Sequence, residues 1–336
     1  MVLKLRDRTK TSLLKDVATF VADRQLELSL VTITAVVLGD LLQIPMATKF
    51  LHLHYRVNSG SGSSLYGTGY DDVYVMSFWF VMFIFLRAFT TQYILGPVAV
   101  MCGIKKADKK QRFVEQSWQL LFFLISWSVG MYIMYHSPYW FSPHHFWIGY
   151  PHQHLSYLTK WYYLIISGYW LSQMFVVHVE KRRKDHVVMV AHHCVTIALL
   201  VGSYFSNLTR IGNAVLCMMD FSDIILALAK SLNYLKFRKA CDYAFGAFVV
   251  SWFYSRHFIF IHIGVSLWKD PVLFRVVRWN PETGNYFGPT AHWIFLTLYW
   301  SLQILLLIWC KSILRVLWTV IRGSKPADSR SDSEDD

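Results

Sequence analysis

Two adjacent histidines and two aspartates stand within apolar stretches of the chain, where ionisable side chains are uncommon. His192 and His193 open the segment HHCVT, and Asp220 and Asp223 belong to the next apolar stretch. A charged group at membrane depth costs about 2.5–3.5 kcal/mol on insertion scales, so it usually faces a protein interior. An imidazole with one nitrogen held by a carboxylate keeps its other nitrogen basic. Such a histidine could take a proton from an attacking nucleophile, or could itself attack an activated acyl group.

The spacing of these residues predicts that they meet across two neighbouring helices. On a helix Asn213, Asp220, Asp223 and Lys230 fall within one stripe about 100° wide. Adjacent histidines point about 100° apart, so both can border one cavity. The connection SNLTR is so short that the two helices must be antiparallel neighbours. A lone histidine in such a stretch is usually a hydrogen-bonded packing residue, but two histidines opposite two aspartates favour a functional site.

Composition places these helices in a membrane. Apolar residues make up 54% of the 336 residues and charged residues only 16%, whereas a soluble domain carries about 25% charge. The net charge of +12 comes from short basic clusters between apolar runs, and a nucleic-acid binder would show a contiguous basic patch instead. The five cysteines form no CxxC pair, so neither a disulfide framework nor a zinc site is indicated. The histidine boxes of membrane di-iron enzymes do not occur, so no metal site is expected.

A membrane span needs about 20 mostly apolar residues. Eight stretches qualify, at roughly 28–46, 73–95, 118–136, 158–178, 187–205, 211–233, 242–267 and 291–318. With alternating spans and a cytosolic N-terminus, the cytosolic segments hold 21 of the 33 lysines and arginines, which is the expected bias for that orientation. The sequence therefore predicts an all-α integral membrane protein of about eight transmembrane helices, with both termini in the cytosol.

The stretch from Glu180 to Lys230 resembles the signature of ceramide synthases. These enzymes show RKD, then HHxxT, SYxxNxxRxG, DxxD and a lysine seven residues later, and the chain carries every one of these motifs in that order. RFVEQSW, YYLIISGYWLSQ, YGTGYDD and FLRAF extend the resemblance over residues 66–318, most closely to fungal members. Ceramide synthases belong to the wider TLC-domain group, which also contains proteins that are not acyltransferases.

The resemblance implies an endoplasmic reticulum enzyme that transfers a fatty acyl group from acyl-CoA to the amine of a sphingoid base, sphinganine or phytosphingosine. Spans three to eight would form a helical barrel that opens to the cytosol, with the thioester near His192 and His193. Asp220 and Asp223 would orient the imidazoles, and one histidine would act as general base or as acyl carrier. No metal or redox cofactor is expected. The alternative is a non-catalytic TLC protein that binds, senses or moves lipids in the same cavity.

We expect the other polar residues of this region to bind the substrates: Arg183, Lys184, Thr196, Tyr204, Asn207, Arg210, Asn213, Lys230 and Arg256. The expected partners are acyl-CoA, the sphingoid base and membrane lipids, and no nucleic acid. A small single-span accessory subunit and homo- or heterodimerisation are further candidates.

The predicted organisation has four parts. Residues 1–27 form a basic cytosolic segment, 28–109 hold two spans with a lumenal loop, 110–320 form the TLC catalytic domain, and 321–336 form a disordered acidic tail. The Gly/Ser stretch at 59–69 is predicted to be the lumenal loop. In the tail, Ser331 and Ser333 each precede an acidic residue by three positions, which is typical of acidophilic kinase sites.

Overall fold

The computed structural model describes residues 20–21, 23–58, 64–180 and 184–322. Within them the α-helices are α2 (Gln25–Leu41), α3 (Pro45–Leu51), α4 (Asp72–Phe89), α5 (Gly96–Met101), α6 (Ala107–Tyr135), α7 (Tyr157–Val179), α8 (His186–Phe205), α9 (Thr209–Tyr234), α10 (Arg238–Phe253), α11 (Phe260–Leu273) and α12 (Pro289–Ile321). The π-helices η1 (Thr90–Leu95) and η3 (Tyr254–Ile259) follow α4 and α10 directly, and the 3₁₀ turns η2 (Pro143–Phe146) and η4 (Pro281–Thr283) lie in loops. Arg183, Ser331 and Ser333 lie outside the described residues.

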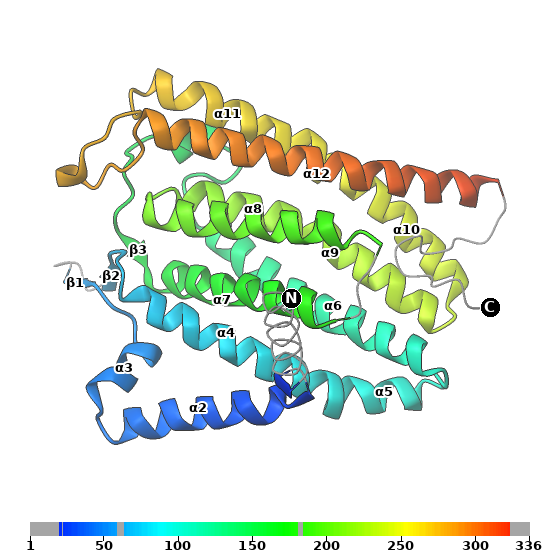
Figure 1. The fold of residues 1–336 in the computed structure, drawn as a ribbon. Helices are drawn as coiled ribbons and strands as arrows, with labels where there is room; N and C mark the ends of the chain where they lie inside the picture. Colours follow the sequence, from blue (N-terminus) through cyan, green and yellow to red (C-terminus); the bar gives the residue numbers. More distant parts are fainter. Residues whose placement is uncertain (1–19, 22, 59–63, 181–183, 323–336) are drawn as a thin grey trace, which may run out of the picture.

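The long helices run side by side in one bundle with two different ends (Figure 1). One end carries the connections α5–α6, α7–α8 and α9–α10. We call it the basic end, because Lys105, Lys106, Lys184 and Lys236 lie in these connections. The opposite end, here the loop-rich end, carries the short β-strands and the long connections 136–156 and 274–288.

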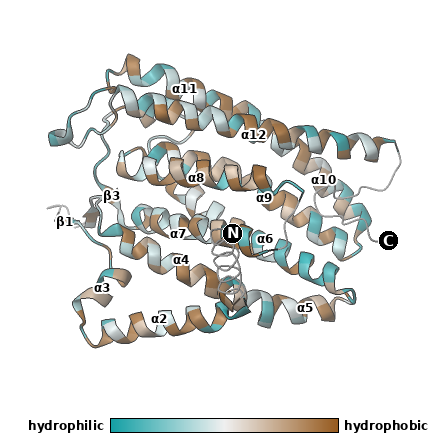
Figure 2. Cartoon of the chain, in the orientation of Figure 1, coloured by the Kyte–Doolittle hydropathy of each residue, from teal (hydrophilic) through white to brown (hydrophobic). Residues whose placement is uncertain are grey.

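The helices confirm an all-α membrane fold. In the part of the chain that the structure describes, six continuous helical stretches are long and apolar enough to cross a bilayer, and a seventh span results if α2 and α3, bent by 116°, are counted together. Hydrophobic residues follow the lengths of the helices, and hydrophilic ones gather towards the connections (Figure 2).

The remaining predicted span corresponds to α7, which has 23 residues but is not among the helices with sufficient hydropathy. It lies beside α4 and α8 in the bundle (Figure 1), and Tyr163 and Leu164 on it are fully buried. A helix that is largely enclosed by protein can carry more polar residues than one that faces lipid, because its polar groups pair inside the bundle.

A small antiparallel sheet closes the loop-rich end. β1 (Arg56–Asn58) pairs with β2 (Ser64–Tyr66), and β2 pairs with β3 (Leu155–Ser156) directly before α7. The prediction of a loop over 59–69 is therefore wrong for residues 64–66, and residues 59–63 lie outside the described residues. Strands of two or three residues have no periodic pattern long enough to be recognised, and β2 and β3 pair across some 90 residues of chain.

A buried ion pair fastens this sheet to the bundle. Lys160 Nζ lies 2.8 Å from Asp72 Oδ1, and both side chains are fully buried. The same ammonium donates to the carbonyl oxygens of His54 (2.8 Å) and Gly67 (2.7 Å). Asp72 Oδ2 accepts from the Tyr204 hydroxyl at 2.7 Å. The pair thus joins α7, α4, α8 and the strand segment at one point.

Replacing Lys160 with methionine is expected to lower the free energy of unfolding by about 3–5 kcal/mol, because it leaves the Asp72 carboxylate buried without its cation. Lys49→Met is the matched control. The Lys49 ammonium pairs with the neighbouring Asp71 at 3.3 Å, but both side chains are about 40% exposed, and such pairs contribute about 1 kcal/mol or less. Thermal unfolding of both variants in one detergent measures the difference. Equal losses would show that burial of the Lys160 pair does not matter.

Candidate active site

A polar cavity of about 180 Å³ lies inside the bundle and reaches its basic end, where Glu180, Asp185 and His186 border it. Each of the six predicted barrel spans contributes to its lining: α6 with Gln116 and Gln119, α7 with Trp170 and Gln173, α8 with His192 and His193, α9 with Asp223 and Lys230, α10 and η3 with Trp252 and Arg256, and α12 with Trp309. None of the lining residues comes from α2 to α5. The chamber therefore belongs to the six helices after the first two spans, as the sequence predicts.

A second, apolar cavity of about 80 Å³ adjoins the first. Its walls are mostly aliphatic and aromatic, with Leu199, Leu200, Ile211, Val215, Leu267, Phe295 and Leu302 among them. The two cavities share Trp170, His192, Asp223 and Arg256. These four side chains therefore stand at a junction between a polar chamber and an apolar one.

The two imidazoles are held at this junction by aromatic packing. The ring centroids of His192 and His193 are 5.7 Å apart, and Trp170 lies edge-on to both, at 5.8 Å and 5.6 Å. Trp309 covers His192 from α12 at 5.1 Å, and its indole N–H donates to Asp185 Oδ2 at 3.2 Å. Within the described residues, His192 Nδ1 is buried without a hydrogen-bond partner. Thr196 lies one turn further along α8 and lines the apolar cavity. Its hydroxyl is likewise buried without a hydrogen-bond partner among the described residues.

The two aspartates have separate surroundings. Asp223 lines both cavities and pairs with Arg256, whose guanidinium lies 2.6 Å from Asp223 Oδ1. Arg256 also donates from Nε to Ser222 Oγ at 2.7 Å and stacks over Trp252. It lies in the π-helix η3, and single π-turns of this kind often occur at functional sites. Asp220, by contrast, accepts a 2.6 Å hydrogen bond from Ser126 of α6 and borders neither cavity.

Among the described residues, the expected hydrogen bond from Asp220 or Asp223 to one of the two imidazoles is absent. The predicted polar residues do lie on one helix, α9, but residues three apart on a helix differ by about 60° in direction. Asn213 and Asp220 therefore turn towards α6, where Asn213 donates to the Gly130 carbonyl at 3.3 Å. Asp223 and Lys230 turn towards the cavity. The catalytic role of Asp220 stays a prediction, and any effect it has on the junction must pass through other residues.

Other predicted substrate-binding residues lie away from both cavities. Tyr204 belongs to the buried ion-pair network described above. Asn207 has a positive φ of 57° in the α8–α9 turn, and its amide donates to the Gly284 carbonyl at 3.0 Å. Arg210 donates to the His145 carbonyl at 2.7 Å. Burial, followed by the charge of Arg210, lowers the pKa of His152 in the same loop to about 4.

Asn213 also donates to the Tyr139 hydroxyl at 2.9 Å. Lys184 is exposed at the basic end and is not part of either lining. Of the predicted substrate-binding residues that the structure describes, Thr196, Lys230 and Arg256 reach a cavity.

Sequence reasoning missed the aromatic side chains and glutamines of the polar cavity. Trp170 and Gln173 stand in the YYLIISGYWLSQ motif and Gln116 in RFVEQSW, yet neither motif was assigned a role. The available signal was a glutamine within a predicted span, as at position 119 or 173, because a polar side chain there needs a partner or a cavity. No group of three or more His, Cys, Asp or Glu side chains suited to a metal ion occurs among the described residues.

Comparisons with known proteins agree with this arrangement. The family model of the TLC domain matches residues 112–315. The chain is 39% identical to the sphingosine N-acyltransferase lag1 of Schizosaccharomyces pombe over 291 residues, which cover 86% of this chain and 74% of that protein. It is 33% identical to the ceramide synthase LAG1 of Saccharomyces cerevisiae over 299 residues, which cover 85% of this chain and 70% of that protein. The chain therefore belongs to the TLC-domain family and, within it, to the group of the sphingosine N-acyltransferases or ceramide synthases.

Proposed function

We propose that the chain is a ceramide synthase, which transfers a fatty acyl group from acyl-CoA to the amine of a sphingoid base. The observation that carries this proposal is the junction at His192, where a polar cavity from the basic end meets an apolar one. A fatty acyl thioester has the same division, because a polar carrier is joined to a hydrocarbon chain at one carbonyl. Placed at the junction, its carbonyl carbon would lie beside the imidazoles.

The reaction forms one bond and breaks one. The amine nitrogen attacks the thioester carbonyl carbon, the carbon–sulfur bond breaks, and the amine gives up one proton while the CoA thiolate takes one up. An imidazole can carry that proton from the amine to the leaving thiolate. It can instead accept the acyl group first and pass it to the amine. Both routes use only the two substrates, and neither calls for a metal or redox cofactor.

Burial of His192 Nδ1 suits either role, because this ring nitrogen has no hydrogen-bond partner among the described residues. The Arg256–Asp223 pair borders the same junction, so the Arg256 guanidinium would stabilise the negative charge that the carbonyl oxygen gains. The Thr196 hydroxyl is a further polar group that suits this role. It lines the apolar cavity one turn from His192 and is unpaired among the described residues.

Release of CoA by purified protein tests this function. With acyl-CoA and a sphingoid base, we expect stoichiometric formation of CoA and ceramide, measured by thiol titration and mass spectrometry. Release of CoA from acyl-CoA alone, limited to one equivalent per protein, would identify the acyl-carrier route. Binding of both lipids without any CoA release would contradict the proposal and favour a non-catalytic lipid-binding protein.

We also propose that the protein lies in the endoplasmic reticulum membrane with the basic end towards the cytosol. The bias of lysine and arginine towards that end supports this orientation. Because Cys102 is itself exposed at the basic end, the test uses a variant without the five native cysteines. In it, a cysteine introduced near residue 105 should react with a membrane-impermeant maleimide in intact microsomes, whereas a cysteine near residue 280 should react only after the membrane is permeabilised. Labelling of position 280 in intact microsomes would reverse the orientation.

A further inference from the structure

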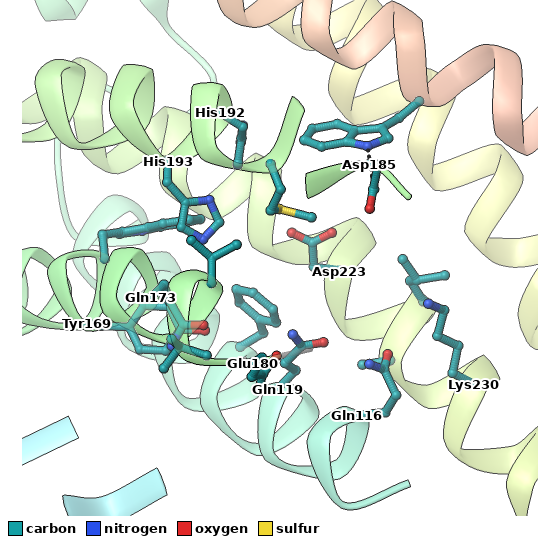
Figure 3. A pocket seen from close by; sticks show the side chains of 18 of the residues that line it. Gln116, Gln119, Tyr169, Gln173, Glu180, Asp185, His192, His193, Asp223 and Lys230 are labelled. Atoms are coloured by element: carbon teal, nitrogen blue, oxygen red, sulfur yellow. Dashed lines mark hydrogen bonds between the residues drawn. The ribbon is translucent and has the colours of Figure 1, made fainter. Parts of the chain in front are cut away.

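Three glutamines line the polar cavity across from the histidines and form what we call the glutamine wall: Gln116, Gln119 and Gln173. Gln116 and Gln119 come from α6 and Gln173 from α7, and Figure 3 shows them together with Glu180, facing the side of the cavity that carries His193 and Asp223. None of these residues has an assigned role in the reaction described above. No charged group is part of the wall itself.

The amides of the glutamine wall make no hydrogen bond with any described residue. Gln116 as a whole is only 5% exposed, yet its amide atoms are not among the fully buried polar atoms, so they face the open space of the cavity. Other amides in the bundle donate to described partners: Gln303 to His257 Nδ1 at 2.8 Å, although its Oε1 is buried without a partner there, Asn285 to the Val276 carbonyl at 3.0 Å, and Asn213 as described above. Amides that face a cavity and have no partner among the described residues can hydrogen-bond to a polar ligand there.

The glutamines lie at different depths: on the neighbouring helices α7 and α8, Gln173 lies six residues from the basic end, as His192 does, and so stands at the level of the imidazoles. Gln116 and Gln119 are three residues apart on one face of α6, so their Cα atoms differ by about 4.5 Å in depth. On the facing helix α9, Lys230 and Asp223 differ by seven residues, or about 10 Å. Glu180 and His186 border the cavity at the basic end, and His192 borders it at the junction. A ligand that reaches from the basic end to His192 therefore shares the polar cavity with all three glutamines.

We infer that the glutamine wall binds the pantetheine arm of acyl-CoA, an inference that rests on the proposed function of the same site. With the thioester at His192 and the nucleotide at the basic end, the segment between them is an uncharged chain of amide groups. Glutamine amides both donate and accept, so they match such a chain. A sphingoid base fits the wall less well. Its polar head must sit at the imidazoles for its amine to react, and the rest of the molecule is hydrocarbon.

Steady-state kinetics of Gln116→Leu, Gln119→Leu and Gln173→Leu test the inference. Leucine keeps a side chain of similar size that is tolerated within a membrane bundle. Each variant should raise KM for acyl-CoA about tenfold, because the arm loses a hydrogen bond in a buried place. KM for the sphingoid base should stay unchanged. With the N-acetylcysteamine thioester of the same fatty acid, which lacks most of the arm, Gln116→Leu should have no effect.

Gln111→Leu is the control. Gln111 lies on the same helix, but it is exposed, and its amide donates to Glu115 at 3.0 Å. Its kinetic constants should match the wild type. A rise in KM for the sphingoid base instead of acyl-CoA would assign the wall to the other substrate and overturn the inference. Equal losses with the full and the truncated donor would overturn it too, because they indicate a structural effect.

Binding of a non-reactive S-alkyl-CoA thioether, measured by calorimetry on the purified protein, separates this inference from the proposed function. The glutamine variants should bind the thioether about tenfold more weakly than the wild type does. That result would support binding of the pantetheine arm by the glutamine wall even if the wild type released no CoA. Only the proposed catalysis would then be contradicted. Unchanged affinity in all three variants would overturn the inference whatever the turnover.

Discussion

Replacing His192 with alanine is expected to lower kcat for CoA release by about 10²–10⁴-fold, the usual effect of removing a group that transfers a proton or an acyl group. His192 is the histidine that borders both cavities, and its Nδ1 is unpaired among the described residues. His193→Ala is expected to have an effect in the same range, since the second imidazole borders the polar cavity beside Trp170. Initial rates with saturating acyl-CoA and sphingoid base measure both.

Two further variants exclude a packing effect. His192→Gln keeps a polar side chain between Trp170 and Trp309, so its thermal stability should stay near that of the wild type while its turnover is lost. His262→Ala removes a histidine of α11 that is exposed on the outside of the bundle and lines neither cavity, and it should remain active. Retention of more than half of wild-type turnover by His192→Ala would contradict a catalytic role for this residue.

The helices of the bundle could be predicted from the sequence because each depends on a local signal. Runs of about 20 apolar residues and the charge bias between them locate α4, α6, α8, α9, α10–α11 and α12. The sharp bend between α2 and α3 falls just before Pro45, whereas the sequence predicts a single span at 28–46 there. The sheet and the Lys160–Asp72 pair could not be predicted, because both depend on contacts between segments far apart in the chain.

The site was predictable where a charge marks it. Histidine, aspartate, lysine and arginine are uncommon inside apolar stretches. The sequence therefore predicts His192, Asp223, Lys230 and Arg256 as site residues, and all four line the polar cavity. Which face of α9 meets α6 and which meets the cavity is not encoded in spacing. The stripe therefore could not separate Asp220 from Asp223. Glutamines carry no charge and are common in ordinary helices. The glutamine wall therefore cannot be predicted from sequence, because it depends on how α6 and α7 pack against α8 and α9.

Asp223→Asn is expected to lower turnover about 100-fold, whereas Asp220→Asn should lower it much less. Groups that orient a catalytic side chain typically contribute 10–100-fold, and Asp223 stands at the junction itself. Asparagine at position 220 keeps an oxygen that can accept the hydrogen bond from Ser126, so the contact of α9 with α6 survives. Comparison of initial rates at equal protein amounts measures the contrast. A greater loss of turnover in Asp220→Asn than in Asp223→Asn would contradict this expectation. It would show that the carboxylate outside both cavities matters more for the reaction.

A double-mutant cycle with Arg256→Gln then shows what the Asp223 carboxylate does. The Asp223–Arg256 pair is short and Arg256 is almost fully buried, so Asp223→Asn leaves an unpaired guanidinium and should also lower the melting temperature. If Asp223 only neutralised Arg256, its replacement would have no further effect on turnover once position 256 is uncharged. We expect the opposite, with Asp223→Asn lowering kcat by a similar factor in both backgrounds while the double variant recovers thermal stability. A carboxylate needed in both backgrounds acts on the imidazole or the substrate, and its charge contributes to the reaction independently of Arg256.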